Sequence, residues 1–218
     1  MLKPPQIKKN LINKGENNQI FDSFFSCNQN KKIILEEKSK LSYFSYGHGS
    51  DIDIKFELKG EYSELDVYCI FASCDENKSK INIDTKLNAN FCKVNIYIVS
   101  FLANNGIVDV KANIDIGKNI KGVSGHLLEE NILLGEKISV KTLPILNVSS
   151  NDVSASHGAK IQKIDNEKLF YMMSKGLSLH ETKKLIVKGY FDNILGLSNL
   201  DLEKKNKIFE TFLEYIKL

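Results

Sequence analysis

The chain has 218 residues, of which 42% are hydrophobic and 26% charged, proportions typical of globular proteins. At this length a chain can bury roughly 70% of its unfolded surface, so folding requires no metal ion or disulfide. The 30 basic and 27 acidic residues are interspersed, and a net charge of +3 without a basic face argues against nucleic-acid binding.

The cysteines and the apolar runs indicate the compartment. Cys27, Cys69, Cys74 and Cys92 are too few and too irregularly spaced for a disulfide framework, and they fit a reducing interior. Residues 1–19 lack the apolar core of a signal peptide, and the longest apolar run, IYIVSFLA, is far shorter than the ~20 residues that span a bilayer. We therefore expect a cytoplasmic protein that binds no membrane.

Residues 1–32 are predicted to form an N-terminal lead-in. Pro4, Pro5 and the polar run from Lys8 to Asn18 indicate an extended arm or a short helix. The first apolar cluster follows only after this run, so we expect the packed core to begin near residue 33.

Residues 33–163 show the alternation of apolar and charged residues that is typical of strands with one solvent-exposed face. Similar alternating segments begin at Ile52, Leu65, Ile81, Lys93, Ile107 and Lys137. About ten short strands are expected, and no helical pattern is long enough to act as a βαβ crossover. A sandwich, a barrel and a β-helix all remain open, because each reads as many short strands without a strict repeat.

The pattern becomes helical in residues 164–218. Asp165 is a plausible N-cap for a helix over residues 166–175, and the pair Ser178 and Glu181 has the spacing of a capping box that begins a second helix. An apolar stripe near the C-terminus predicts a third helix.

Some residue types suggest chemistry without forming a complete motif. Cys69 and Cys74 have a metal-like spacing, but an odd separation on a continuous strand places them on opposite faces. His48, between glycines, is expected to be a solvated loop residue. A metal enzyme that uses these three residues is one hypothesis and predicts stoichiometric metal. The sequence contains none of the common nucleotide-binding, metalloprotease or hydrolase motifs, which argues against an enzyme.

His157 lies in the segment SHGA at the predicted end of a strand. The small neighbours Gly158 and Ala159 leave room for another chain or a ligand to approach the imidazole. A neutral imidazole can bind a soft or borderline metal or transfer a proton near pH 7. His157 is therefore the strongest candidate site residue.

Residues 151–191 contain NDVSASHGAKIQKID, LFYMMSKGLS and ETKKLIVKGYF in unbroken order, and these segments resemble the C-terminal signature of the SufB/SufD family of iron-sulfur cluster assembly proteins. The preceding segment ENILLGEKISVKTLPILNV, from Glu130, is also similar to that family. The resemblance implies a mainly β fold, with a right-handed parallel β-helix core over residues 33–163 and a small C-terminal α-helical domain over residues 164–218.

The resemblance also implies a non-enzymatic scaffold or accessory subunit of the SUF system. Such a subunit pairs through its β-helix core with a SufB-like homologue or a second copy of itself. It docks a SufC-type ABC ATPase through its C-terminal helices. The positions that match the docking region are Asp165, Glu167, Leu169, Phe170, Tyr171, Met172, Ser174 and Gly176.

Two positions match the region where the family forms a cluster. His157 falls on a histidine that the SufD branch is thought to contribute near a transient iron-sulfur cluster at a subunit interface. Glu129 stands where the SufB branch has a cysteine, and Gly158 stands where that branch tends to have a glutamate. Both departures favour a SufD-like role. Glu129 is a weaker candidate ligand, since an exposed strand glutamate is the simpler expectation, and no resident metal site is predicted.

One alternative from another class of function remains. The chain could be a purely structural interaction module, in which His157 is a packed residue at the end of a strand and the cysteines belong to the core. His157→Ala would then lower thermal stability without changing the capture of partners.

Overall fold

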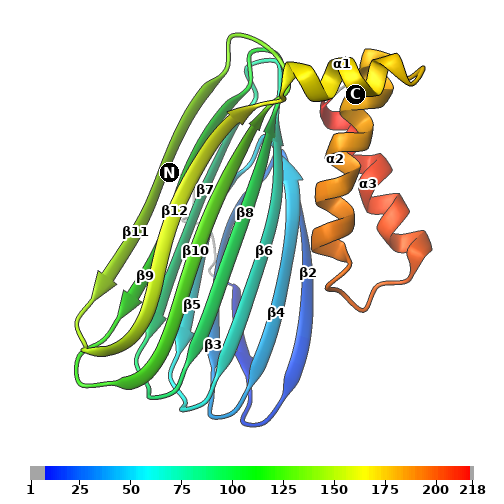
Figure 1. The fold of residues 1–218 in the computed structure, drawn as a ribbon. Coiled ribbons are helices and arrows are strands. Elements are labelled where there is room, and N and C mark those ends of the chain that lie inside the picture. Colours follow the sequence, from blue (N-terminus) through cyan, green and yellow to red (C-terminus); the bar gives the residue numbers. More distant parts are fainter. Residues whose placement is uncertain (1–7, 217–218) are drawn as a thin grey trace, which may run out of the picture.

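The computed structural model describes residues 8–216, and within this range twelve strands form two six-stranded parallel sheets. The odd-numbered strands form one sheet and the even-numbered strands the other (Figure 1). The strands are β1 (Lys8–Ile12), β2 (Asn17–Phe25), β3 (Asn28–Leu35), β4 (Lys40–His48), β5 (Asp51–Leu58), β6 (Glu64–Ser73), β7 (Lys78–Leu87), β8 (Lys93–Leu102), β9 (Ile107–Ile116), β10 (Lys121–Leu133), β11 (Ser139–Val148) and β12 (Asp152–Lys163).

Each coil of the chain contributes one strand to each sheet, because consecutive strands alternate between the sheets. Lys8 lies opposite Lys31, 23 positions later, whereas Ile107 lies opposite Ser139, 32 positions later. The coils therefore lengthen along the chain, which explains why the sequence shows no strict repeat. The arrangement is a parallel β-helix, as the family resemblance implied, and neither a sandwich nor a barrel.

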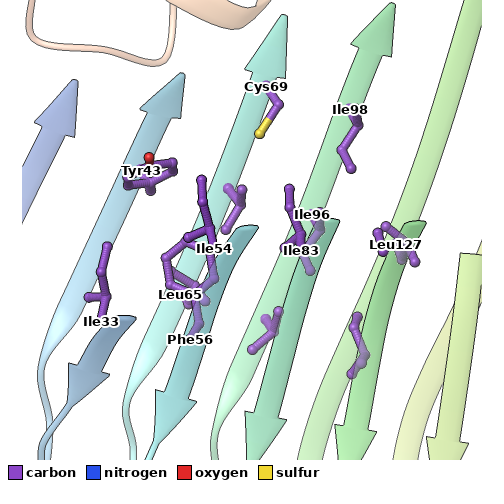
Figure 2. Packing of buried hydrophobic residues seen from close by; sticks show 14 of the residues in the cluster. Ile33, Tyr43, Ile54, Phe56, Leu65, Cys69, Ile83, Ile96, Ile98 and Leu127 are labelled. Atoms are coloured by element: carbon purple, nitrogen blue, oxygen red, sulfur yellow. The ribbon is translucent and has the colours of Figure 1, made fainter. Parts of the chain in front are cut away.

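The interior of the β-helix is filled by one face of every strand. Along β5, Ile52, Ile54 and Phe56 are fully buried while the residues between them face outward, as the alternation predicted. Figure 2 shows Tyr43 and Cys69 on the even-numbered sheet projecting toward the same interior space. Burial of these side chains is the main stabilising contribution to the fold.

A largely buried ion pair, with 8% of the Lys31 side chain and 17% of the Asp22 side chain exposed, lies inside the first coils. The ammonium of Lys31 on β3 donates a very short hydrogen bond to the carboxylate of Asp22 on β2, and the Tyr43 hydroxyl donates to the same carboxylate oxygen at 2.6 Å. Burial and the neighbouring carboxylate raise the pKa of the Tyr43 hydroxyl. The three groups join the two sheets across the interior near its N-terminal end.

Three helices follow the β-helix: α1 (Asn166–Ser174), α2 (Leu179–Leu195) and α3 (Leu202–Ile216). α2 and α3 lie beside the outer face of the even-numbered sheet (Figure 1), where Phe191 and Phe212 pack against Phe101 of β8 and neighbouring side chains. α1 buries no residue. None of the helices within residues 8–216 combines the length and apolar character needed to cross a bilayer.

The β-helix begins earlier than the sequence pattern indicated. β1, β2 and the start of β3 occupy positions assigned to a lead-in, whereas Pro4 and Pro5 lie outside the described residues. The pattern is weak there because a first coil has a neighbour on one side only, so its strands keep polar residues such as Asn17 and Asn18. Residues 8–32 belong to the β-helix.

Candidate functional site

The last coil of the β-helix leaves the interior open at one end. β11 is the outermost strand of the odd-numbered sheet and β12 the outermost strand of the even-numbered sheet. On β12 the inward-facing residues Ala159 and Ile161 are exposed, although the residues opposite them on β10 are buried. This end therefore presents interior surface and two free strand edges.

His157 lies in the middle of β12 and faces this open end. It pairs in register with Leu127 of β10, whose side chain belongs to the interior core. Its Nδ1 lies 3.1 Å from the carbonyl oxygen of Pro144 on β11. A carbonyl only accepts, so Nδ1 carries the proton, and Nε2 keeps a lone pair that can bind a metal. The imidazole is exposed and is held across the gap between the two sheets.

Glu129 lies one coil further inside, and the expectation of an exposed side chain was wrong. Its side chain is 1% exposed and accepts a very short hydrogen bond from the Thr142 hydroxyl on β11. Burial raises the pKa of the carboxyl to about 7, although the bonds from Thr142 and from the backbone of Ala112 oppose the shift. Glu129 faces inward because it lies two positions after the buried Leu127 on the same strand.

Two further polar residues, which were not among the predicted site residues, lie near Glu129. Asn131 and Ser100 lie opposite each other on β10 and β8, and both are buried. Both polar atoms of the Asn131 amide, the Ser100 hydroxyl and Oε1 of Glu129 have no hydrogen-bond partner among the described residues. The alternation that begins at Leu127 could have revealed Asn131, since every second residue of β10 faces the interior.

The open end thus combines an imidazole with a buried carboxylate. His157 and Glu129 contact β11 at Pro144 and Thr142, which lie two positions apart on the same face of that strand. Imidazole and carboxylate are ligands that suit iron and other borderline metals. None of the four cysteines lies on β10, β11 or β12, so this chain places no thiolate at the open end.

The small residue after His157 is not required by packing within the chain. A Cβ atom added at Gly158 would meet only the Leu128 side chain, at 3.7 Å, which is an ordinary contact. This space lies on the outer face of β12 beside Leu128, whereas the imidazole of His157 points to the opposite face of the strand, so Gly158 does not make room beside the imidazole.

The residues expected to bind a partner lie on or beside α1. Asp165 caps this helix by accepting a hydrogen bond from the backbone of Glu167 at 2.9 Å, and Gly176 follows the helix with a φ of +94°. Phe170 is 76% exposed and Tyr171 63% exposed. Leu169 and Met172 are half-buried, whereas Ser174 and the other expected positions are exposed. The two large aromatic side chains of α1 are therefore exposed to solvent in the single chain.

The hypothesis of a metal enzyme grouped three residues that the structure separates. Cys69 is buried inside the β-helix, whereas Cys74 lies outside it beside His48, with 3.7 Å between Sγ and Nε2. His48 is buried and not a solvated loop residue, because the C-terminal turn of α3 covers it. Within residues 8–216 no three His, Cys, Asp or Glu side chains are grouped to hold a metal ion.

These features define a parallel β-helix with a helical C-terminal region and an open last coil that carries an exposed imidazole. A family model described as the SufBD core domain of the SUF system for FeS cluster assembly matches residues 24–190. The match covers well over half of the 218 residues, so the chain belongs to the SufBD family.

Individual relatives agree with this assignment. The iron-sulfur cluster assembly protein SufD of Escherichia coli (strain K12) is 24% identical over 131 residues, which are 60% of this chain and 31% of the relative. SufB of Bacillus subtilis is 24% identical over 166 residues, or 74% of this chain and 36% of the relative. A SufBD family protein of Staphylococcus aureus is 30% identical over 144 residues, or 66% and 28%. The chain spans about a third of the length of these relatives.

Proposed function

We propose that this chain is a non-enzymatic scaffold or accessory subunit that assembles an iron-sulfur cluster together with a second β-helix subunit. The observation that carries the proposal is the open last coil, where an oriented His157 stands at two free strand edges. Membership of the SufBD family supports the general role. The partner, the cluster and the docked ATPase are parts of the proposal.

Pairing follows from the exposed interior of the last coil. An apolar sheet edge left open favours addition of a strand from another chain. The inward-facing residues of β12 are nearly symmetric in size about His157, in the order Val153, Ala155, His157, Ala159 and Ile161. Antiparallel pairing with a second copy about a two-fold axis at His157 would therefore place Val153 against Ile161 and Ala155 against Ala159. A SufB-like homologue with a matching edge could take the same place.

The cluster would form where the two edges meet, as transient cargo and not as a resident cofactor. In this arrangement His157 offers Nε2, and Glu129 offers a carboxylate that loses its proton when a metal binds. The partner must supply any thiolate, because the cysteines of this chain lie elsewhere. The chain would hold and orient the cluster without catalysing a reaction by itself.

Docking of a SufC-type ABC ATPase is proposed for α1. This helix is held by its Asp165 cap, buries no residue and exposes Phe170 and Tyr171. Rigid exposed aromatics are the side chains that most often dominate the free energy of protein association. ATP hydrolysis would belong to the docked subunit.

The test is anaerobic cluster reconstitution with the ATPase and the pairing subunit present. The wild type is compared with His157→Ala and with His126→Ala, a control histidine on the outer face of β10. We expect cluster yield and cluster transfer to fall only in His157→Ala. Equal yields in all three proteins would refute the assignment of the site.

A purely structural interaction module is the alternative function. The observation in its favour is that no metal-ligating group of three residues is assembled within residues 8–216. In that case His157→Ala would leave cluster yield unchanged, and α1 variants would still lose their partner.

A further inference from the structure

Tyr215, near the end of α3, packs against the β-helix. Its ring stacks on Phe25 of β2 with 4.5 Å between centroids and lies 5.1 Å from the ring of His48 at the end of β4. Its backbone carbonyl accepts a hydrogen bond from the thiol of Cys74 at 2.9 Å. Cys74 therefore helps to hold the last turn of α3 on the even-numbered sheet.

Cys74 and His48 form a thiol–imidazole pair at this contact. Sγ of Cys74 lies 3.7 Å from Nε2 of His48, and the two residues are 3% and 5% exposed. Burial lowers the pKa of His48, and the negative charge of Asp75 only partly offsets this effect. The imidazole is therefore neutral near pH 7 and able to accept the thiol proton.

A pocket of about 170 Å³ adjoins the thiol, and Cys74, Asn104 and Lys183 are among the residues that line it. Lys183 is anchored by a 2.6 Å hydrogen bond from its ammonium to the carbonyl of Leu134, which keeps a positive charge in the pocket wall. Positive charge near a cysteine favours the thiolate, which is the reactive form, although the carboxylate of Asp75, which also lines the pocket, acts in the opposite direction. The pocket has room for a small substituent on sulfur, about the size of a cysteine side chain.

The buried Cys69 and Cys92 have serine hydroxyls as side-chain partners, and not an imidazole. Cys69 lies inside the β-helix, and burial raises the pKa of its thiol to about 12. Burial also raises the pKa of Cys92. Because no third His, Cys, Asp or Glu joins Cys74 and His48 to complete a metal site within residues 8–216, the pair is better suited to covalent chemistry than to metal binding.

We propose that Cys74 is a modification site that exchanges with small-molecule disulfides and, once modified, releases the last turn of α3. His48 takes the thiol proton, and the thiolate attacks one sulfur of the disulfide. The disulfide bond of the reagent breaks as a new one forms to Cys74, and the other half leaves as a thiolate that recovers the proton from His48. The adduct fills the pocket, and the Tyr215 carbonyl loses its donor. A free thiol reverses the step.

The experiment exposes the chain to bis(2-hydroxyethyl) disulfide and follows each cysteine by peptide mass spectrometry. We expect Cys74 to be modified at least tenfold faster than Cys69 and Cys92, with the half-buried Cys27 quantified separately in the same digest. His48→Phe keeps a ring against Tyr215 but removes the base, so modification of Cys74 should slow at least tenfold. His48→Gln serves as a second variant if the phenylalanine disturbs folding.

Hydrogen exchange then tests the consequence for α3. Exchange in residues 202–216 should accelerate in the modified wild type and stay slow in Cys74→Ser treated in the same way, since serine keeps a donor for Tyr215. Modification of Cys74 no faster than of Cys92, a rate unchanged in both His48 variants, or unchanged exchange in α3 after modification would each overturn the proposal. None of these readouts depends on cluster assembly.

Discussion

His157 and Glu129 reach the same strand from two successive coils of the β-helix. Nδ1 of His157 lies 3.1 Å from the carbonyl oxygen of Pro144, and the carboxylate of Glu129 accepts a hydrogen bond from Thr142, two positions earlier on β11. The His157 side chain is exposed, whereas Glu129 is buried one coil further in, two positions along β10 from Leu127, which pairs with His157.

His157→Ala should separate function from stability. The imidazole is exposed, so we expect the free energy of unfolding to change by less than about 1 kcal/mol. If His157 binds the cluster as proposed, its loss should lower cluster yield at least tenfold. Urea denaturation measures the first quantity, and the absorbance of the reconstituted complex measures the second. If His157→Ala instead lowers the free energy of unfolding by several kcal/mol, the lower cluster yield would reflect a structural role of His157.

Pairing through the last coil predicts that Ile161→Lys prevents association. Ile161 is 51% exposed in the single chain, so the substitution should change stability little while it places a charge in the proposed interface. Leu143→Lys on the outer face of β11 is the matched control, since Leu143 is 46% exposed. Analytical ultracentrifugation should show loss of the pair in the first variant only. Persistence of the pair in Ile161→Lys would exclude this interface.

The docking role of α1 predicts a selective loss of partner binding. Phe170→Ala combined with Tyr171→Ala should weaken binding of the ATPase at least tenfold, because large aromatics contribute most to such interfaces. Both side chains are exposed, so the melting temperature should stay within a few degrees of the wild type. Leu202→Ala, an equally exposed position on α3, should bind normally. Binding can be measured by titration calorimetry.

Because burial raises the pKa of Glu129, we expect the free energy of unfolding to depend on pH. The folded-state pKa of about 7 lies above the ordinary value of 4.5, so the folded chain favours the protonated form. The stabilising contribution of Glu129 to the free energy of unfolding is therefore fully present below pH 4.5, and it is lost as the pH rises through about 7. Glu129→Gln lacks this titration and should be more stable than the wild type by about 2–3 kcal/mol at pH 8, with little difference at pH 4.5. Denaturation at both pH values checks the sign, and a constant difference would contradict the prediction.

Because Asp22 and Lys31 form an ion pair, we expect removal of one partner to lower the free energy of unfolding more than replacement of both partners. Asp22→Ala should cost about 3–5 kcal/mol, since it leaves a buried ammonium without its partner. Asp22→Leu combined with Lys31→Met should cost less, because no charge then remains buried and only the Tyr43 hydroxyl loses its acceptor. The exposed pair of Lys14 and Glu37 is the control, and Lys14→Ala should cost at most about 1 kcal/mol. Urea denaturation of each variant measures its free energy of unfolding, and equal costs for the single and the double variant would contradict the prediction.

Local signals in the sequence predicted the elements that depend on near neighbours. The capping box of Ser178 and Glu181 is present and begins α2, and Asp165 caps α1. The alternation around Ile52 correctly indicated which face of β5 is buried. Such features need only residues a few positions apart, so a sequence pattern can reveal them.

The sequence by itself thus predicted the strands from residue 33 onward, the helices and the candidate His157, while only the tertiary structure revealed the first strands and decided what surrounds these elements. Coils that lengthen from 23 to 32 residues hide the repeat, so the pattern could not choose the β-helix without the family resemblance. Glu129 and His48 looked exposed, yet one is covered by the opposite sheet and the other by α3. Burial of a polar side chain depends on contacts between distant segments, and it is these contacts that set its pKa and its chemistry.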